Sequence, residues 1–262
     1  MEQTVIDVQH LSKSFSVGTQ QVEILRDISF TVNKGDFTVI FGPSGCGKST
    51  LLHTLLGLEV PTKGEINVLG THLYNSLSED AMSDFRKKAI GMVYQQPNWI
   101  SALKVLENVE FPLLLLGDGS SDGVERATNL LDKLQMTEWA NYFPTELSSG
   151  QQQKVALARA LITNPELIIA DEPTGNLDFA SGQELMELLA GVNKEGKTII
   201  MVTHDLEYTK YAKQIIEMFD GKIIKISNQK GNWKLPRDKG LKRVTDGKMF
   251  DNSNSNKTKA SK

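Results

Sequence analysis

Short apolar runs alternate along this chain with longer segments of helical periodicity. The run "FTVIF" (37–41) ends at a glycine-rich turn. The segment after that turn, "STLLHTLLGLE", places leucines at 51, 52, 55, 56 and 58, which is the spacing of one helix face. These two segments predict a buried strand followed by an amphipathic helix.

The same alternation continues through the rest of the chain. Four more strands are predicted, over 65–70, 90–94, 165–173 and 196–205. A helical pattern over 181–195 precedes the last of them. Repeated strand–helix units of this kind predict a mostly parallel sheet covered by helices, which is the α/β class.

Two regions depart from the alternation. In "IIEMFDGKIIKI", Asp220 and Gly221 stand between two apolar runs, which predicts a β-hairpin. Residues from about 98 to 160 have helical periodicity and little strand character. We therefore expect a helical subdomain over about 98–160.

Composition restricts the class of protein. The chain has 262 residues, 39% hydrophobic and 23% charged, as in soluble globular proteins. Its single cysteine, Cys46, excludes a disulfide framework and fits a reducing compartment. The longest apolar run, "LLLL" at 113–116, is far shorter than the ~20 residues that span a bilayer, and the N-terminus resembles no secretory signal. We expect a cytosolic chain that reaches a membrane only through a partner.

Charge is distributed unevenly along the chain. The net charge is −3, yet residues 227–262 contain ten Lys and Arg against three Asp. This basic tail is polar and short of apolar residues, which predicts a flexible extension. It either contacts anionic lipid or nucleic acid, or only keeps the chain soluble. The acidic remainder argues against a duplex-binding protein, so we expect no specific nucleic-acid partner.

The strongest motif is "GPSGCGKST", which fits the phosphate-loop pattern G-x-x-x-x-G-K-[ST]. Glycines let the backbone curl so that its N–H groups point at phosphate oxygens, and the following helix adds its positive end. Lys48 would reach the β- and γ-phosphates, and the Ser49 hydroxyl would bind Mg²⁺. The flanking strand and helix favour this interpretation over a turn that binds nothing. The predicted nucleotide-binding residues are Gly42, Pro43, Ser44, Gly45, Cys46, Gly47, Lys48, Ser49 and Thr50.

Two acids follow a buried strand in "LIIADE". Asp171 could hold Mg²⁺, and Glu172 could orient and deprotonate an attacking water. Adjacent carboxylates at a strand end repel one another unless a positive group lies opposite. The alternative interpretation is a pair of solvated acids in a turn. The presence of the phosphate loop in the same chain disfavours this alternative.

Taken in order, these motifs resemble those of the ATPase subunits of ATP-binding cassette (ABC) transporters over residues 1–226. "GPSGCGKST" resembles the Walker A motif, and "LIIADEPTGNLD" resembles Walker B joined to the D-loop that ends at Asp178. "MVYQQ" (92–96) resembles the Q-loop, and "VTHD" (202–205) resembles the switch region. The resemblance implies a P-loop NTPase fold with a RecA-like core, an antiparallel β subdomain from the N-terminal region and a helical subdomain.

The resemblance also implies roles for single residues, with ATP and Mg²⁺ as substrate and cofactor. Gln95 would contact Mg²⁺ and the attacking water, and His204 the γ-phosphate. Phe15 lies where the family stacks an aromatic ring on adenine, although Phe15 taken alone is more typical of a core residue. Asp178 would belong to the nucleotide site. The catalytic set is thus Glu172, His204 and Gln95, and the metal set Ser49, Gln95 and Asp171.

The stretch "LSSGQ" (147–151) resembles the signature loop of this family, usually LSGGQ. In that family two subunits pair head to tail, so that each ATP lies between one Walker A motif and the partner's signature loop. Ser148, Gly150 and Gln151 would contact nucleotide in this way. Ser149 departs from the usual glycine, and if that position needs φ > 0 the serine costs around 1 kcal/mol.

Within the family, "ADEPTGNLD" and "ENVEFPLLL" resemble the branch that serves lipoprotein release, macrolide and peptide export, and cell division. The resemblance implies a homodimer or heterodimer of ATPase subunits on the cytoplasmic face of the membrane, driving a separate permease. The permease would dock near Gln95–Leu106, a segment that departs from the branch pattern. We expect Trp99 and Ile100 to line this docking groove, unless Trp99 belongs to the core.

Other functions remain possible at this point. A soluble or regulatory ABC ATPase would keep the fold without transport. A chromosome-maintenance ATPase needs a long coiled coil, for which the roughly fifty residues between Gln95 and Leu147 leave no room. A scaffold without turnover is disfavoured by the intact Lys48, Glu172 and His204, and an unrelated P-loop kinase or GTPase by "LSSGQ" and "VTHD".

Overall fold

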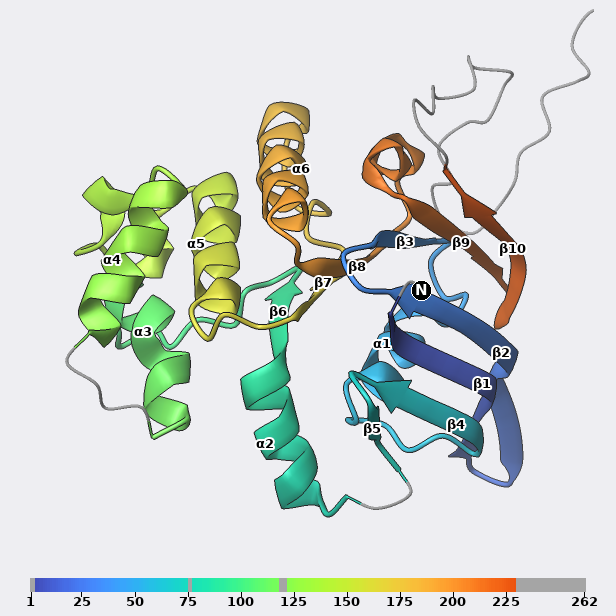
Figure 1. The fold of residues 1–262 in the computed structure, drawn as a ribbon. Coiled ribbons are helices and arrows are strands. Elements are labelled where there is room, and N and C mark those ends of the chain that lie inside the picture. The colour runs from blue at the N-terminus through green and yellow to red at the C-terminus, as the bar shows by residue number, and fades with distance from the viewer. Residues whose placement is uncertain (1–2, 75–76, 118–121, 230–262) are drawn as a thin grey trace, which may run out of the picture.

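The structure is a computed structural model that describes residues 3–74, 77–117 and 122–229 (Figure 1). Its strands form two sheets, one of four strands in the order β2-β1-β4-β5 and one of six in the order β10-β9-β3-β8-β7-β6. Most of the expected basic tail therefore lies outside the described residues. None of the helices in the described ranges has the length and hydropathy of a transmembrane segment.

The four-stranded sheet is antiparallel and is built by the N-terminal region, as expected. Its strands are β1 (Thr4–Val17), β2 (Gln20–Asn33), β4 (Lys63–Val68) and β5 (Thr71–His72). A tight turn at Gly18, where φ is 61°, joins β1 to β2. Alternate β1 residues such as Ile6 and Val8 are buried, because a strand directs every second side chain to one face.

The six-stranded sheet is mostly parallel, which confirms the α/β prediction. Its strands are β3 (Phe37–Phe41), β6 (Ile90–Tyr94), β7 (Leu167–Asp171), β8 (Thr198–Thr203), β9 (Gln214–Phe219) and β10 (Lys222–Asn228). Only β10 runs antiparallel, paired with β9. Asp220 and Gly221 have φ of 46° and 74°, the two left-handed residues that a tight hairpin turn requires, so the predicted hairpin is confirmed.

Helices cover both faces of the larger sheet (Figure 1). They are α1 (Lys48–Leu55), α2 (Glu79–Ala89), α3 (Val105–Leu115), α4 (Gly123–Lys133), α5 (Ser149–Leu161) and α6 (Phe179–Lys194). Three short 3-10 helices, η1 (Thr137–Trp139), η2 (Pro144–Glu146) and η3 (Leu206–Tyr211), complete the fold. Figure 1 shows α3, α4 and α5 together at one end of the molecule and the four-stranded sheet at the other.

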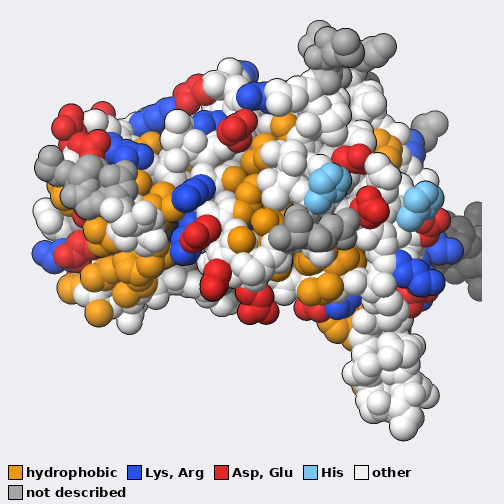
Figure 2. All heavy atoms as spheres, turned by 60° about the horizontal axis from the view of Figure 1, so that its bottom comes forward, with side chains coloured by type: hydrophobic (Ala, Val, Ile, Leu, Met, Phe, Trp, Pro, Cys, Tyr) orange, Lys and Arg blue, Asp and Glu red, His pale blue; other side chains and the backbone are white. Residues whose placement is uncertain are grey.

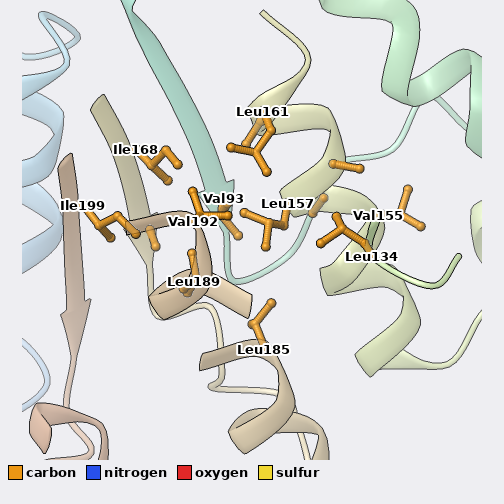
Figure 3. Packing of buried hydrophobic residues seen from close by; sticks show 14 of the residues in the cluster. Val93, Leu134, Val155, Leu157, Leu161, Ile168, Leu185, Leu189, Val192 and Ile199 are labelled. Carbon is orange, nitrogen blue, oxygen red and sulfur yellow. The ribbon is translucent and has the colours of Figure 1, made fainter. Parts of the chain in front are cut away.

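Two hydrophobic clusters lie on opposite faces of the six-stranded sheet. Ile168 and Ala170 of β7 join the cluster formed with α3, α4, α5 and α6, part of which Figure 3 shows. Leu167 and Ile169 of the same strand join the other cluster, which contains the leucines of α1 and the inner face of the four-stranded sheet. The continuous apolar run of β7 is thus explained by burial on both faces. Helix α1 is held between the two sheets.

Several boundaries differ from those expected from the sequence. The helix after the phosphate loop ends at Leu55 rather than at 59, and the chain then turns at Gly57, where φ is 68°. Helix α2 precedes β6 but was not predicted, because its apolar positions are few and only Met82 is buried. Strand β10 continues to Asn228, two residues beyond the expected boundary of 226.

Candidate active site

The predicted site residues follow neighbouring parallel strands. In the sheet, β3 pairs with β8, β8 with β7, and β7 with β6, with Phe41 opposite Thr203 and Tyr94 opposite Asp171. The carboxyl ends of these strands therefore meet at one edge, where α/β proteins bind ligands. The phosphate loop, the Q-loop, the acid pair and His204 all leave the sheet at this edge.

The phosphate loop adopts a backbone that depends on its glycines. Gly45 and Gly47 have φ of 79° and 103°, a left-handed region that side chains disfavour. A Cβ at Gly47 would lie 2.9 Å from Cδ2 of Leu25, and one at Gly42 would collide with the carbonyl oxygen of Met218. Helix α1 begins at Lys48, so its first N–H groups face the loop. This geometry forms an anion-binding cradle.

Lys48 lies inside this cradle with its side chain 5% exposed. Its Nζ donates to the carbonyl oxygens of Gly42 at 2.8 Å and Pro43 at 3.1 Å. The same Nζ lies 3.7 Å from Oε1 of Glu172. A buried ammonium is stable only when it is paired and hydrogen-bonded, as here. The site therefore keeps a fixed positive charge between the loop and the carboxylate.

Glu172 is held in a strained backbone conformation. Its φ of 44° is left-handed, which for a residue with a Cβ costs roughly 1–2 kcal/mol. The backbone N–H donates to the carbonyl oxygen of Val202 in β8 at 3.1 Å, and Oε2 lies 2.8 Å from Nδ1 of His204. Both Glu172 oxygens are thus oriented, one toward Lys48 and one toward His204. The pattern of residues in the sequence does not reveal this strain.

The neighbouring Asp171 ends β7 in a partly buried position. Burial raises the pKa of its carboxyl group, and the negative charge of Glu172 raises this pKa further, while His53 and Lys48 oppose the shift. An additional cation nearby would therefore stabilise the ionised form of Asp171. In the part of the chain that the structure describes, no group of three or more His, Cys, Asp or Glu side chains could hold a metal ion by itself.

Replacing Asp171 with asparagine is expected to raise the melting temperature of the nucleotide-free protein at pH 7. Because the folded state raises the pKa of this carboxyl above its ordinary 3.8, the ionised group lowers stability as the pH increases through that range. Asparagine removes the disfavoured charge. Thermal melts between pH 3.5 and 7 measure the effect: the gain should shrink toward the acidic limit, where Asp171 is protonated. Equal melting temperatures at pH 7 would contradict this account.

Gln95 follows β6 and lies against the loop that follows the acid pair. Its Nε2 donates to Oδ1 of Asn176 at 3.4 Å. A Cβ at Gly175 would lie only 2.7 Å from this Nε2, so a side chain at that position would displace the Gln95 amide. Gln95 also lines a cavity of about 360 Å³ together with Trp99 and Ser149. A second cavity, of about 160 Å³, is lined by both Glu172 and His204.

Asp178 uses its carboxylate to begin α6. Oδ1 accepts from the backbone N–H of Ser181 at 3.0 Å, and Oδ2 accepts from the Ser181 hydroxyl at 2.7 Å. These hydrogen bonds lower the pKa of Asp178. A Cβ at Gly150 would lie 2.9 Å from Oγ of Ser181, so the signature loop and the start of α6 lie in contact.

The signature loop begins α5 with a reciprocal cap. Oγ of Ser148 accepts from the N–H of Gln151 at 3.3 Å, and Oε1 of Gln151 accepts from the N–H of Ser148 at 2.8 Å. Ser149 is the first residue of the helix and has helical backbone. Position 149 therefore does not need φ > 0, and the steric cost that would follow from that need does not arise in this structure.

Phe15 lies near the far end of β1 and is half-buried. Nζ of Lys13 lies 4.7 Å from the centroid of its ring, at cation–π distance. The same ammonium pairs with Glu59 at 2.5 Å and donates to the carbonyl oxygen of Val60 at 2.6 Å. The ring is thus held beside the chain that follows α1, and its contact with adenine stays a prediction.

Residues of α5 that sequence reasoning did not select make direct contacts with the Q-loop region. Nε2 of Gln153 donates to the carbonyl oxygens of Tyr94 at 3.1 Å and Gln95 at 2.8 Å, and Gln152 accepts a hydrogen bond from Trp99. The available signal in the sequence is the run of three glutamines at 151–153.

Comparison with known proteins identifies relatives of the whole described region. A family model described as "ABC transporter" matches residues 25–175. An uncharacterized ABC transporter ATP-binding protein of Methanocaldococcus jannaschii, MJ1508, is 45% identical over 225 residues, which cover 86% of this chain and 100% of that protein. The macrolide export ATP-binding/permease protein MacB of Bdellovibrio bacteriovorus is 43% identical over 84% of this chain, which spans 33% of MacB.

Solved structures agree with these sequence matches. A dimeric post-hydrolysis state of the ATP-binding cassette MJ0796, bound to ADP and Pi, superposes with a TM-score of 0.80 at 36% identity. The superposition covers 87% of this chain and 100% of that one. Its protein, from Methanocaldococcus jannaschii, is 41% identical to this chain in sequence.

Proposed function

Because this chain belongs to the ABC transporter family, we propose that it is the ATP-hydrolysing subunit of a membrane transport complex. The observation that carries this proposal is the constellation at the strand ends. There Glu172 lies between Lys48 at 3.7 Å and His204 at 2.8 Å, beside a glycine-dependent anion cradle. This arrangement combines phosphate binding with a carboxylate base, which phosphoryl transfer to water requires.

We assign the chemical roles as follows. The N–H groups of the phosphate loop and Lys48 bind the triphosphate, and Phe15 packs against the adenine. Glu172 accepts the proton of the attacking water, and His204 keeps the Glu172 carboxylate in position through Nδ1. The strained backbone of Glu172 supports this assignment, because residues other than glycine that have a left-handed φ are concentrated at functional sites.

Mg²⁺ fits the residues that surround the cradle. Ser49, Asp171 and Gln95 would hold it together with phosphate oxygens, since these protein groups offer one hydroxyl, one carboxylate and one amide oxygen. The raised pKa of Asp171 supports this assignment, because a nearby divalent cation would favour its ionised form. When bound, the ion neutralises charge on the phosphates.

We further propose that the active unit is a head-to-tail dimer, formed with a second copy or with a related ATPase subunit. Within one chain, Ser148 forms hydrogen bonds inside its own helix cap, and Gly150 lies against Ser181. A second chain would bring its signature loop, with Ser148, Gly150 and Gln151, to the phosphate loop of the first. The dimeric structure of the relative MJ0796 with ADP and Pi supports this arrangement.

The permease is proposed to be a separate polypeptide. MacB is named as an ATP-binding and permease protein in one chain, and the present chain spans a third of it. We place the docking segment at 95–106, on the cytoplasmic face of the membrane. It leads into α3, where Leu114 and Leu115 are more than half exposed, and Figure 2 shows hydrophobic side chains gathered at this end of the molecule.

Residues 1–226 are proposed as one ABC ATPase domain, with the helical subdomain at about 98–160, and 227–262 as a basic extension.

The proposed ATPase function is tested by measuring ATP hydrolysis by the purified full chain. A Lys48→Ala variant serves as the matched control, because it removes the buried ammonium from the cradle. Hydrolysis that is equal in both proteins would contradict the proposed function.

Trp99→Ala is expected to prevent co-purification with the partner permease, because a tryptophan commonly anchors a docked helix. Truncating a fully buried tryptophan lowers the free energy of unfolding by roughly 3–5 kcal/mol. Trp99 is half-buried, so the loss of stability, and with it the decrease in melting temperature, should be smaller. Trp139→Ala is the matched control, since Trp139 is also partly buried against the same cluster but lies outside the docking segment. An early melt of Trp99→Ala, with unchanged co-purification, would identify Trp99 as core.

A further inference from the structure

The side-chain amide of Gln152 joins two parts of the site that are far apart in the sequence. Its Oε1 accepts a hydrogen bond from Nε1 of Trp99 at 2.9 Å. Its Nε2 donates to the carbonyl oxygen of Leu147 at 3.1 Å. Trp99 belongs to the docking segment, and Leu147 is the first residue of the signature loop. One planar amide therefore connects the two.

Trp99 is fixed to α5 by its ring face as well as by its edge. The guanidinium carbon of Arg159 lies 4.5 Å from the centroid of the ring. Arg159 also donates to the carbonyl oxygens of Pro97 and of Asn98, the latter at 3.3 Å. Gln152 and Arg159 are seven residues apart, so they lie on the same face of the helix. The indole thus has little freedom to move without α5.

Gln153 makes a third connection between the same elements. It is 2% exposed, and its Nε2 binds the carbonyl oxygens of Tyr94 and Gln95. These bonds hold the beginning of the segment, whereas Gln152 and Arg159 hold its middle. Among the described residues, the Gln152 amide carries the hydrogen bond that continues from this segment to the backbone of the signature loop.

We propose that Gln152 is a positioning residue that couples the conformation of the docking segment to the placement of the signature loop. This inference rests on the proposed function, in which the signature loop completes the site of a second subunit. When Trp99 moves, the Gln152 amide changes the position of the Leu147 carbonyl and of the α5 start. The signature loop is then presented correctly to nucleotide only while the indole is seated on α5.

The proposal requires both hydrogen bonds of Gln152. Gln152→Leu keeps a similar volume and removes both. Trp99→Phe keeps an aromatic ring for Arg159, removes the N–H donor and makes the ring system smaller. If the two residues act through one connection, the double variant should be no worse than either single variant. Trp139→Phe is the matched control, because it removes an indole N–H from the helical end of the molecule without affecting Gln152.

The test measures ATP-dependent dimerisation of the full chain by sedimentation, with Glu172→Gln present throughout to prevent turnover. We expect Gln152→Leu and Trp99→Phe each to weaken the dimer by about tenfold, the double variant by the same factor, and Trp139→Phe not at all. ATP affinity of the monomer and the melting temperature should stay close to those of the parent.

Three results would overturn the inference. Dimers as stable as the parent's would show that Gln152 does not place the signature loop. Losses that multiply in the double variant would show that Gln152 and Trp99 act independently. A lower melting temperature without weaker dimers would make Gln152 a purely structural residue. A parent that fails to dimerise with ATP would instead contradict the proposed function itself, and the inference with it.

Discussion

Glu172→Gln is expected to lower steady-state ATP turnover by a factor on the order of 10² or more while ATP binding is retained. The amide keeps the size of the side chain and can still bond to His204, whose Nδ1 lies 2.8 Å from Oε2 in the wild type. It cannot accept a proton from water. The loss should therefore appear in kcat, and nucleotide affinity measured by equilibrium binding should change little.

Glu207→Gln is the matched control for this experiment. Glu207 lines the same cavity as Glu172 and His204, but its Oε1 is bonded to Nε2 of Gln183 at 2.8 Å. The control should therefore keep wild-type turnover. If Glu172→Gln hydrolyses ATP at nearly the wild-type rate, the proton acceptor is another group.

Ser148→Arg is expected to abolish the ATP-dependent dimer while the monomer still binds nucleotide. In the proposed dimer the signature loop approaches the triphosphate of a second chain closely, and a long cationic side chain at its first serine would prevent this. Ser148 also caps α5, so part of the effect could come from a weakened helix start. Ser78→Arg is the matched control, because Ser78 caps α2 in the same way, outside the signature loop.

Mixing the Ser148→Arg chain with a Lys48→Ala chain tests whether the loop acts across the interface. In a mixed dimer one site combines an intact phosphate loop with an intact signature loop, and the other site carries both defects. We expect the mixture to recover part of the dimer signal that each variant lacks alone, measured by sedimentation with ATP. Complete absence of recovery would mean either that both sites are required for pairing or that the trans arrangement is wrong.

The strands around the site were predictable because their sequence pattern has a single physical explanation. A run such as 90–94, apolar at nearly every position and too short for a buried helix, fits a strand covered on both faces, and β6 occupies those residues. The phosphate loop was predictable for a similar reason. Its glycines at 45 and 47 are required by left-handed backbone, and its lysine begins the next helix.

Other features depend on contacts between distant residues, and the sequence does not encode them locally. Asn108 resembles an ordinary polar helix residue, yet it is fully buried and binds the backbone of Ile100, Leu103 and Lys104. The condition for a steric cost at Ser149 is not met, because the Ser148 cap sets the start of α5 and Ser149 has helical backbone. Roles that require a second chain or a nucleotide remain predictions.

Burial of β7 on both faces has a consequence for the energetics of opening. Leu167 and Ile169 face one cluster and Ile168 and Ala170 the other, so β7 separates from the sheet only if both clusters open. Its local unfolding free energy should approach that of global unfolding. Asp171 ends this strand and Glu172 follows it directly, so the acid pair is attached to a strand that is fixed on both faces. The signature loop contributes Leu147 to one cluster and otherwise uses polar side chains, so its movement does not require both clusters to open. Rearrangement during the ATP cycle can thus be confined to one half of each composite site.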